Sequence, residues 1–250
     1  MAEPFLAVDR IICRFGGLLA VNAASLSAAE RRITALIGPN GAGKTTLFSI
    51  ISGSIKADGG SVHYDGTDIT GEPPHRRARR GIARTFQIVQ PFAGLSVRDN
   101  ILVGAHLRHR ARDDALAAAD RIGHDVGLGE FLDRPADTLT VAGRKRLELA
   151  RALATEPKVM LLDEVLAGLN PSEIRDIVPF IRDLCSRGIT ILMIEHVMQA
   201  VMSLAERVFV LAEGRIIAEG TPAQVVADPV VVEAYLGHGA AAKLGAPHGP

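Results

Sequence analysis

Near its N-terminus the chain reads Gly38-Pro39-Asn40-Gly41-Ala42-Gly43-Lys44-Thr45-Thr46, which fits the pattern G-x-x-x-x-G-K-[ST]. An apolar, β-branched run precedes it at residues 33–37, and residues 47–52 after it read as a helix that Gly53 ends. A strand, a glycine-rich loop and a helix in this order are the context in which this pattern holds nucleotide phosphates. The flanks therefore favour a phosphate-binding loop over an ordinary glycine turn.

Each residue type in this loop has a physical reason to meet phosphate. The three glycines let the backbone turn its N–H groups toward phosphate oxygens, and the N-terminus of the following helix adds partial positive charge. We expect Lys44 to reach the β- and γ-phosphates, Thr45 to give a hydroxyl to Mg²⁺, and Thr46 to place a further hydroxyl nearby. The loop thus predicts binding of a nucleoside triphosphate with Mg²⁺.

The bulk composition limits the class of protein. The chain has 250 residues, 48% of them hydrophobic, enough for a core in one large domain or two closely joined subdomains. Its 28 basic and 28 acidic residues cancel, so no global charge points to nucleic acid or an anionic membrane. Cys13 and Cys185 have no metal or redox spacing, which suits a reducing compartment. We see no export signal and no apolar run near the roughly 18 residues of a membrane span, so a membrane role would need separate membrane subunits.

The chain alternates between strand-like and helix-like regions. Residues 5–90 contain short β-like runs with turns, residues 95–155 become helical, and strand signals return with a helix among them over residues 156–221. A strand, a helix and a strand in succession predict a parallel sheet, hence an α/β fold with an inserted helical subdomain. We expect a C-terminal helix at 222–236 and a disordered tail at 237–250, which is rich in glycine, alanine and proline.

Two carboxylates end the strand-like run Val159-Met160-Leu161-Leu162-Asp163-Glu164. An open α/β sheet places its chemistry at such strand ends, so we expect Asp163 to hold Mg²⁺ and Glu164 to orient or deprotonate the attacking water. His196 follows another strand-like run and could hydrogen-bond a γ-phosphate oxygen, although a lone histidine is more often structural. The alternative for the carboxylates is a solvated pair, which the nearby phosphate loop disfavours.

The phosphate loop, Gln87, the pair Asp163 and Glu164, and His196 follow one another along the chain. In this order they resemble the motifs of the nucleotide-binding subunits of ABC transporters, and the resemblance covers about residues 5–236. The resemblance implies the ABC ATPase fold: a P-loop NTPase with a RecA-like parallel core, an N-terminal antiparallel β subdomain and the helical insertion. It implies that Gln87 contacts Mg²⁺ and the attacking water and links the ATP site to a membrane subunit. It also implies that Phe15 stacks on adenine with Val21 as an apolar neighbour. A core aromatic and a surface polar residue are the alternatives for Phe15 and Gln87.

One segment departs from the family pattern. Where the family commonly has Leu-Ser-Gly-Gly-Gln, this chain has Leu139-Thr140-Val141-Ala142-Gly143, then Arg144-Lys145-Arg146 and a predicted helix at 147–153. The resemblance implies that residues 140–143 close over the ATP of a second subunit. Val141 and Ala142 add Cβ atoms where glycines allow close approach, which could weaken that contact. The side chains of the three cations either bind a phosphate that a partner subunit brings or are solvated on the helix exterior. Val165, Asn170 and Val197 are smaller departures from the family pattern, and they leave the main polar contacts of the site possible.

Residues 92–106, the segment 167–170 and the end of the chain are similar to ATPases that import branched-chain and other hydrophobic amino acids. The resemblance implies two transmembrane permease subunits, a second ATPase subunit, a periplasmic or extracellular solute-binding protein, and a peripheral place on the cytoplasmic face of the inner membrane. Urea or amide import, lipopolysaccharide export, and an ATP sensor with weakened hydrolysis remain alternatives. We expect no nucleic-acid partner, because the basic run at 75–80 lacks aromatics and reads as a solvated helix face.

Two further classes fit the sequence less well. A soluble ABC ATPase of DNA repair or translation would usually carry long coiled-coil insertions or two tandem cassettes, and the sequence shows neither pattern. A small-molecule kinase with a phosphate loop would lack the arrangement of Gln87 and His196 and would need an acceptor site. An ATP-hydrolysing transporter subunit is therefore the main prediction.

Overall fold

In the computed structural model, which describes residues 4–86, 90–92 and 94–236, two sheets lie on either side of a shared core. The first sheet is antiparallel, with strand order β2-β1-β4-β5. Its strands are β1 (Leu6–Phe15), β2 (Leu18–Ala28), β4 (Gly59–Tyr64) and β5 (Thr67–Asp68). Several register shifts between β1 and β2 mark bulges, which bend the pair and change which side chains face inward.

The second sheet is mostly parallel, in the order β10-β9-β3-β8-β7-β6, and only the pairing of β10 with β9 is antiparallel. Its strands are β3 (Ile33–Ile37), β6 (Ile82–Arg84), β7 (Val159–Asp163), β8 (Thr190–Ile194), β9 (Arg207–Ala212) and β10 (Arg215–Gly220). Every residue of β3, β7 and β8 is buried, as expected for parallel strands covered on both faces.

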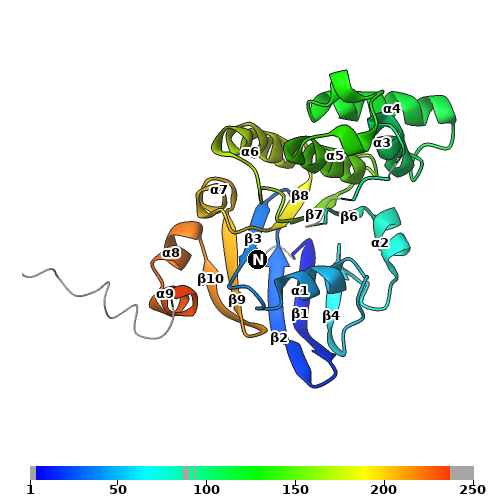
Figure 1. Cartoon of the computed structure of the whole chain (residues 1–250). Coiled ribbons are helices and arrows are strands. Elements are labelled where there is room, and N and C mark those ends of the chain that lie inside the picture. The colour runs from blue at the N-terminus through cyan, green and yellow to red at the C-terminus, as the bar shows by residue number, and fades with distance from the viewer. Residues whose placement is uncertain (1–3, 87–89, 93, 237–250) are drawn as a thin grey trace, which may run out of the picture.

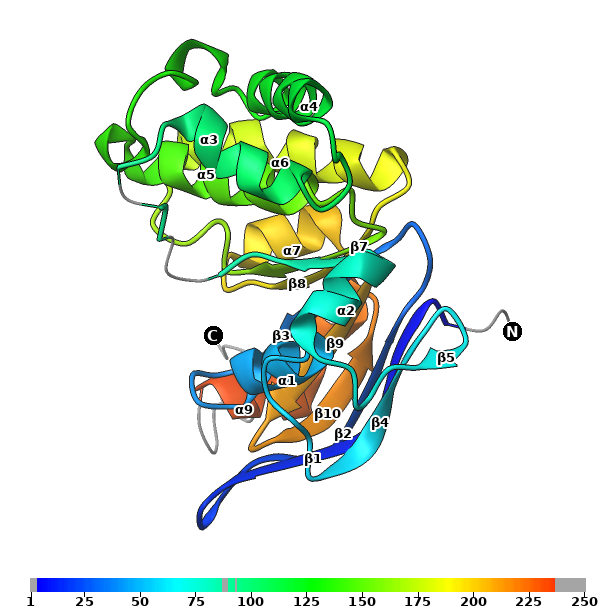
Figure 2. The same cartoon turned by 90° about the vertical axis from the view of Figure 1, so that its right-hand side faces the viewer.

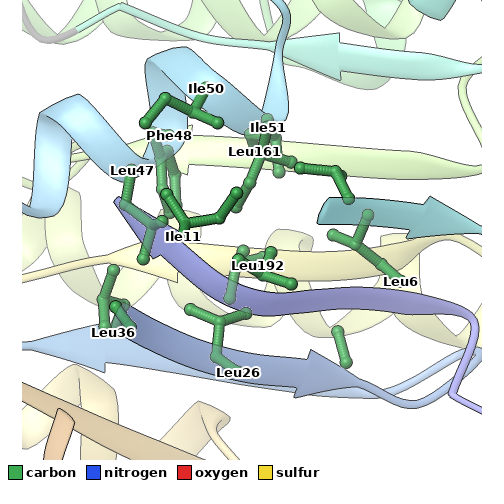
Figure 3. Close-up of a cluster of buried hydrophobic side chains, with 14 of the residues drawn as sticks. Leu6, Ile11, Leu26, Leu36, Leu47, Phe48, Ile50, Ile51, Leu161 and Leu192 are labelled. Atoms are coloured by element: carbon green, nitrogen blue, oxygen red, sulfur yellow. The ribbon is translucent and has the colours of Figure 1, made fainter. Parts of the chain in front are cut away.

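One face of the parallel sheet shares its core with the antiparallel sheet. Figure 3 shows Leu47, Phe48 and Ile51 of α1 (Lys44–Ile51) meeting side chains that come from both sheets. Alternate side chains of the parallel strands point to the opposite face, where they pack against α6 (Pro171–Ser186) and α7 (Met198–Leu204). Helix α1, which follows the glycine loop, is thus fixed by the two sheets together.

The helices between the strands of the parallel sheet form a core of their own. They are α3 (Val97–Ala105), α4 (Arg112–Asp125) and α5 (Val141–Leu153), with short 3₁₀ turns at Gly129–Phe131 and Ala136–Thr138. Figures 1 and 2 show this helical region at one end of the molecule and strands β1, β2 and β4 at the other. Two short helices, α8 (Pro222–Val226) and α9 (Pro229–Leu236), end the described chain beside β10. The predicted α/β architecture is confirmed.

Helix α2 (Pro74–Arg80) corrects the prediction of a purely solvated basic face. The Arg77 side chain is only 2% exposed, and its guanidinium donates hydrogen bonds to five backbone carbonyls, including those of Ile50 and Ile51 at the end of α1. A guanidinium has five N–H donors in a planar fork, so a single arginine can satisfy several helix-end carbonyls. Arg77 therefore fixes the far end of the phosphate-loop helix.

Among the residues that the structure describes, none of the helices combines the length and the apolar character needed to cross a bilayer.

Candidate nucleotide site

The glycine loop connects β3 to α1, and its conformation explains two of its glycines. Gly38 and Gly43 have φ angles of 150° and 104°. A Cβ on Gly38 would lie 1.9 Å from the carbonyl oxygen of Leu211, and a Cβ on Gly43 would lie 2.3 Å from that of Ala20. Only glycine avoids both the strained angle and these contacts with backbone atoms, so the chain itself requires glycine at both ends of the loop.

Lys44 opens α1 and folds back over the loop. Its Nζ donates to the carbonyl oxygens of Gly38 and Pro39, at 2.8 and 2.9 Å, and the side chain is buried. Burial lowers the pKa of the ammonium group, while the nearby carboxylates Glu164 and Asp163 oppose that shift. The lysine is thus held at the loop's mouth by bonds that phosphate oxygens could replace.

A cleft of about 820 Å³ opens over the loop. It is lined by the loop residues Asn40, Gly41, Ala42, Gly43, Lys44, Thr45 and Thr46, by Phe15, Leu18, Leu19 and Ala20 of the β1–β2 hairpin, and by Glu164, His196, Glu213 and Gly214. Phe15 lies at the end of β1 and is 48% exposed, so its ring faces solvent at the cleft instead of the core. An exposed aromatic at this edge can stack on a flat ring.

The structure corrects the prediction for Val21. Its side chain is fully buried in β2 and belongs to the core beneath the cleft. Leu18, Leu19 and Ala20 of the same strand line the cleft in its place. The reason is the bulge between β1 and β2 near this point, which breaks the simple alternation of inward and outward side chains.

Glu164 and His196 come together at the carboxyl ends of neighbouring strands. Glu164 follows β7 and His196 follows β8 by two residues, and the parallel pairing places Asp163 of β7 beside Ile194 of β8. The Glu164 Oε1 lies 2.5 Å from His196 Nε2. Both side chains line the same cleft as the glycine loop. A carboxylate and an imidazole in hydrogen-bond contact can hold or transfer a proton at this point.

Asp163 is the last residue of β7 and is almost fully buried. Its Oδ2 accepts a hydrogen bond from Arg84 at 2.8 Å, whereas its Oδ1 has no hydrogen-bond partner among the described residues. Burial raises the pKa of this carboxyl, against the lowering effect of Arg84. Asp163 and Thr45 line a second cleft of about 490 Å³, and Thr45 lines the first cleft as well.

An unsatisfied carboxylate oxygen near a threonine hydroxyl fits a small divalent cation. Within the described ranges, no group of three or more His, Cys, Asp or Glu residues could hold a metal ion. Mg²⁺ does not need such a group, because it is usually held by one or two carboxylates together with water and substrate phosphates. Asp163 and Thr45 therefore fit Mg²⁺ bound together with a nucleotide.

The segment 140–143 lies at the start of α5 and not in a loop before it. The helix begins at Val141, six positions before the predicted start, because the Thr140 side chain caps it by accepting a hydrogen bond from the Gly143 N–H at 3.2 Å. Val141 is 58% exposed, and its Cγ1 lies next to Gly168 of the segment 167–170. The segment thus presents a helix N-terminus and an exposed apolar side chain to the outside.

Comparison with known protein families gives this geometry a context. A family model described as ABC transporter matches residues 21–167, more than half of the chain. The chain belongs to the ABC transporter family. A second model, described as branched-chain amino acid ATP-binding cassette transporter, matches residues 215–241 of this ABC protein.

Full-length relatives of this ABC protein are of the LivG/BraF type. The chain is 41% identical over 254 residues to the high-affinity branched-chain amino acid transport ATP-binding protein BraF of Pseudomonas aeruginosa, with 95% of this chain and 99% of that protein covered. It is 39% identical over 253 residues to LivG of Escherichia coli, which bears the same description, with the same coverage. The ABC protein is thus an ATPase of this type.

Solved ATP-binding cassettes share its fold. A nucleotide-free cassette from an ABC transporter superposes with a TM-score of 0.87 at 34% identity, covering 94% of this chain and 100% of that one. A cassette in its ADP conformation superposes with a TM-score of 0.85 at 34% identity, covering 95% of this chain and 100% of that one. The predicted ABC ATPase fold is confirmed.

Of the three cations after Gly143, only Lys145 is buried, while Arg144 and Arg146 are partly exposed and bind backbone carbonyls of their own chain. Arg144 donates to the carbonyl oxygens of Leu139 and Asp137, and Arg146 donates to that of Val126. Lys145 is buried, and its Nζ lies 2.9 Å from the carbonyl oxygen of Glu164. The solvated alternative is therefore wrong for Lys145, whereas for Arg144 and Arg146 contact with a partner's phosphate stays a prediction.

Sequence reasoning missed the buried contacts of Arg84, Lys145 and Glu195. Arg84 ends a buried strand, where a charged residue would have been a signal, but its partner Asp163 lies 79 positions away. Glu195 is almost fully buried, accepts a hydrogen bond from the Leu166 N–H at 3.0 Å, and burial raises its pKa to about 7. Gln87, to which the resemblance assigns a role, lies outside the described residues.

Proposed function

We propose that this chain is the ATP-hydrolysing subunit of an importer of branched-chain or other hydrophobic amino acids. The single observation that carries the proposal is the cleft that brings together the glycine loop, Glu164 and His196. The full-length similarity to BraF and LivG, whose names describe branched-chain amino acid transport, supports the substrate class.

In the proposed reaction the loop holds the phosphates of ATP. Backbone N–H groups of the loop and of the start of α1 would donate to phosphate oxygens, and the Lys44 ammonium would exchange its two loop carbonyls for β- and γ-phosphate oxygens. Phe15 stacks on the adenine ring at the edge of the cleft. The loop thereby fixes the direction of the γ-phosphate toward Glu164 and His196.

Asp163 and Thr45 would hold Mg²⁺ between this chain and the bound nucleotide. The ion supplies positive charge that offsets the negative charge on the transferring phosphoryl group. Asp163 offers its Oδ1, while Arg84 keeps the other carboxylate oxygen in place. The resemblance adds Gln87 to this set, and we retain it as part of the proposal.

Glu164 would position and deprotonate the attacking water, and His196 would donate a hydrogen bond to a γ-phosphate oxygen. In the structure the two side chains contact each other. In the proposed reaction each would exchange this contact for its own partner, water for Glu164 and a γ-phosphate oxygen for His196. The hydrolysis site is completed only when both side chains are drawn to the γ-phosphate.

The proposed assembly has two such ATPase subunits, identical or paralogous, that close on each other around ATP. Thr140, Val141, Ala142 and Gly143 of one subunit would cover the nucleotide held by the other, with the N-terminus of α5 facing the γ-phosphate. We place the pair on the cytoplasmic face of the membrane, bound to two transmembrane permease subunits. A solute-binding protein on the other side would deliver the amino acid.

Two measurements test the proposal. Phosphate release by the chain with its co-purified permease should fall at least about a hundredfold on Glu164→Gln, as expected for loss of a general base, and should be unchanged on Glu30→Gln, an exposed carboxylate far from the cleft. Cells without the chain should lose uptake of labelled leucine and keep uptake of glutamate. Equal phosphate release by wild type and Glu164→Gln would refute the hydrolysis claim, and unchanged leucine uptake would refute the substrate class.

A further inference from the structure

Lys145 occupies an unusual place for a lysine. It lies in the second turn of α5, five positions after the capping Thr140, and is only 6% exposed. Its Nζ donates to the carbonyl oxygen of Glu164 at 2.9 Å. Burial lowers the pKa of its ammonium group, and the surrounding carboxylates, Glu195 first among them, oppose that shift. A buried lysine needs such partners, and here one of them is the backbone of the proposed catalytic carboxylate.

The peptide at Glu164 needs to be held. Glu164 has a φ angle of 50°, in the left-handed region that non-glycine residues rarely adopt. Its N–H donates to the carbonyl oxygen of Ile194 at 3.0 Å, so β8 anchors one side of the residue. On the other side, the Glu164 carbonyl oxygen accepts hydrogen bonds from the Lys145 Nζ at 2.9 Å and from the Ala167 N–H at 3.2 Å. Lys145 is the side-chain donor among these anchors, which together orient the side chain that meets His196.

We propose that Lys145 is a positioning residue that links the segment 140–143 to Glu164 of the same subunit. This inference rests on the proposed function, in which residues 140–143 close over the ATP of the second subunit. Helix α5 begins in that segment and carries Lys145, so the two parts move together as one rigid element. Contact of the segment with one ATP thereby sets the position of Glu164 at the other ATP.

The link gives the paired sites a physical route of communication. When residues 140–143 meet the γ-phosphate held by the partner, α5 is pulled toward it, and Lys145 moves the carbonyl of Glu164. Because the surrounding bonds hold Glu164 at its strained backbone angle, a displacement of its carbonyl changes the direction of its carboxylate. Each subunit would thus present its base correctly only while its own α5 is engaged by the partner's nucleotide.

The test compares Lys145→Met with Arg146→Met in the transporter complex. Methionine keeps most of the side-chain volume and removes the ammonium. Arg146 is on the same helix, but its guanidinium donates to Val126 and does not reach Glu164. We expect Lys145→Met to lower kcat about 10- to 100-fold with the KM for ATP changed less than about threefold, Lys145→Arg to recover most of the loss, and Arg146→Met to stay near wild type.

A double-mutant cycle separates positioning from a structural role. If Lys145 acts through Glu164, adding Lys145→Met to Glu164→Gln should lower the single-turnover rate no further. An additive loss, or a kcat for Lys145→Met equal to wild type, would overturn the inference. A wild type without ATPase activity would instead refute the proposed function itself, so the two failures are distinguishable.

Hydrogen exchange gives a readout besides activity. In Lys145→Met without nucleotide, the peptide spanning residues 160–168 should exchange faster than in wild type or Arg146→Met, because one anchor of Glu164 is lost. In the Glu164→Gln background, ATP should slow this exchange, and Lys145→Met should remove that slowing. Wild-type exchange in both comparisons would contradict the link, and the thermal unfolding midpoint checks that each variant is folded.

Discussion

In the phosphate loop, Gly38 and Gly43 are required by the chain's own packing, whereas residues 140–143 form the ordinary first turn of a helix. A Cβ at either loop glycine would collide with a backbone carbonyl oxygen of this chain. Val141 and Ala142, in contrast, carry their Cβ atoms without strain, and Val141 points into solvent. Any need for glycine at positions 141 and 142 would come from a partner and not from the fold.

This difference explains why the two regions follow their family patterns so unequally. A residue that the chain's own backbone requires cannot change without loss of the loop, so the loop keeps its glycines. A residue that only a partner requires can change together with that partner, or at the cost of a weaker contact. In the proposed dimer, the segment 140–143 is therefore adapted to the partner subunit, whereas the loop glycines are adapted to the fold of their own chain.

The largest expected effect is on the loop. Gly43→Ala places a Cβ 2.3 Å from the Ala20 carbonyl oxygen at a φ angle of 104°, so the loop must shift. We expect the affinity for ATP, measured by titration calorimetry, to fall at least about a hundredfold, since several N–H donors and Lys44 are displaced together. Gly17→Ala, where a Cβ meets open space, should bind ATP like wild type. Wild-type affinity in Gly43→Ala would show that the glycine is not required.

A second effect concerns the junction between the core and α5, where Glu195 is buried near Lys145. Its pKa is raised from 4.5 to about 7, so between these values the unfolded chain loses the proton that the folded chain keeps, and Glu195 destabilises the fold as pH rises. Glu195→Gln removes this cost. Its free energy of unfolding relative to wild type should therefore increase from pH 5 to pH 8, by at most about 3 kcal/mol.

Denaturant unfolding at both pH values measures this change, and Glu30→Gln, an exposed carboxylate, serves as the control. A constant difference between Glu195→Gln and wild type across the range would mean that Glu195 titrates like an exposed residue.

Substitutions in the segment 140–143 should have a smaller effect than substitutions in the loop. They should strengthen an ATP-dependent contact, whereas the loop substitution weakens ATP binding. Changing both Val141 and Ala142 to glycine, in the Glu164→Gln background, should tighten ATP-dependent dimerisation a few-fold, because backbone can then approach the partner's nucleotide. The same change should cost about 1 kcal/mol of stability per glycine in α5. Analytical ultracentrifugation and thermal unfolding report the two effects. Weaker dimerisation would indicate that the two Cβ atoms contribute to the contact.

The smallest effect is expected at the helix cap. Thr140→Ala removes the acceptor for the Gly143 N–H and should lower the free energy of unfolding by about 1 kcal/mol, whereas Thr140→Ser should be nearly neutral. Chemical denaturation measures both variants. If Thr140→Ala leaves the free energy of unfolding unchanged, the hydroxyl would act only on the partner's nucleotide and not as a helix cap.

The local motifs predicted much of the fold and part of the site. The loop, the strand end at Asp163 and Glu164, and the α/β class all follow from short patterns with a strong physical meaning. Arg84 and Lys145 could not be placed, because their contacts join residues far apart in sequence through strand order and helix packing. Val21 was misplaced since a bulge shifts the register of β1 and β2, and hydrophobic alternation does not reveal a bulge.

The central claim is that ATP held by the loop of one subunit is closed by residues 140–143 of another. The direct measurement is light scattering during size-exclusion chromatography of Glu164→Gln, alone and mixed with any second ATPase of its transporter. We predict a dimer with ATP and Mg²⁺, a monomer without them, and a monomer that still binds ATP when Ala142→Glu is added, because its carboxylate would face the γ-phosphate. A monomer at saturating ATP, or a dimer unaffected by Ala142→Glu, would contradict the account.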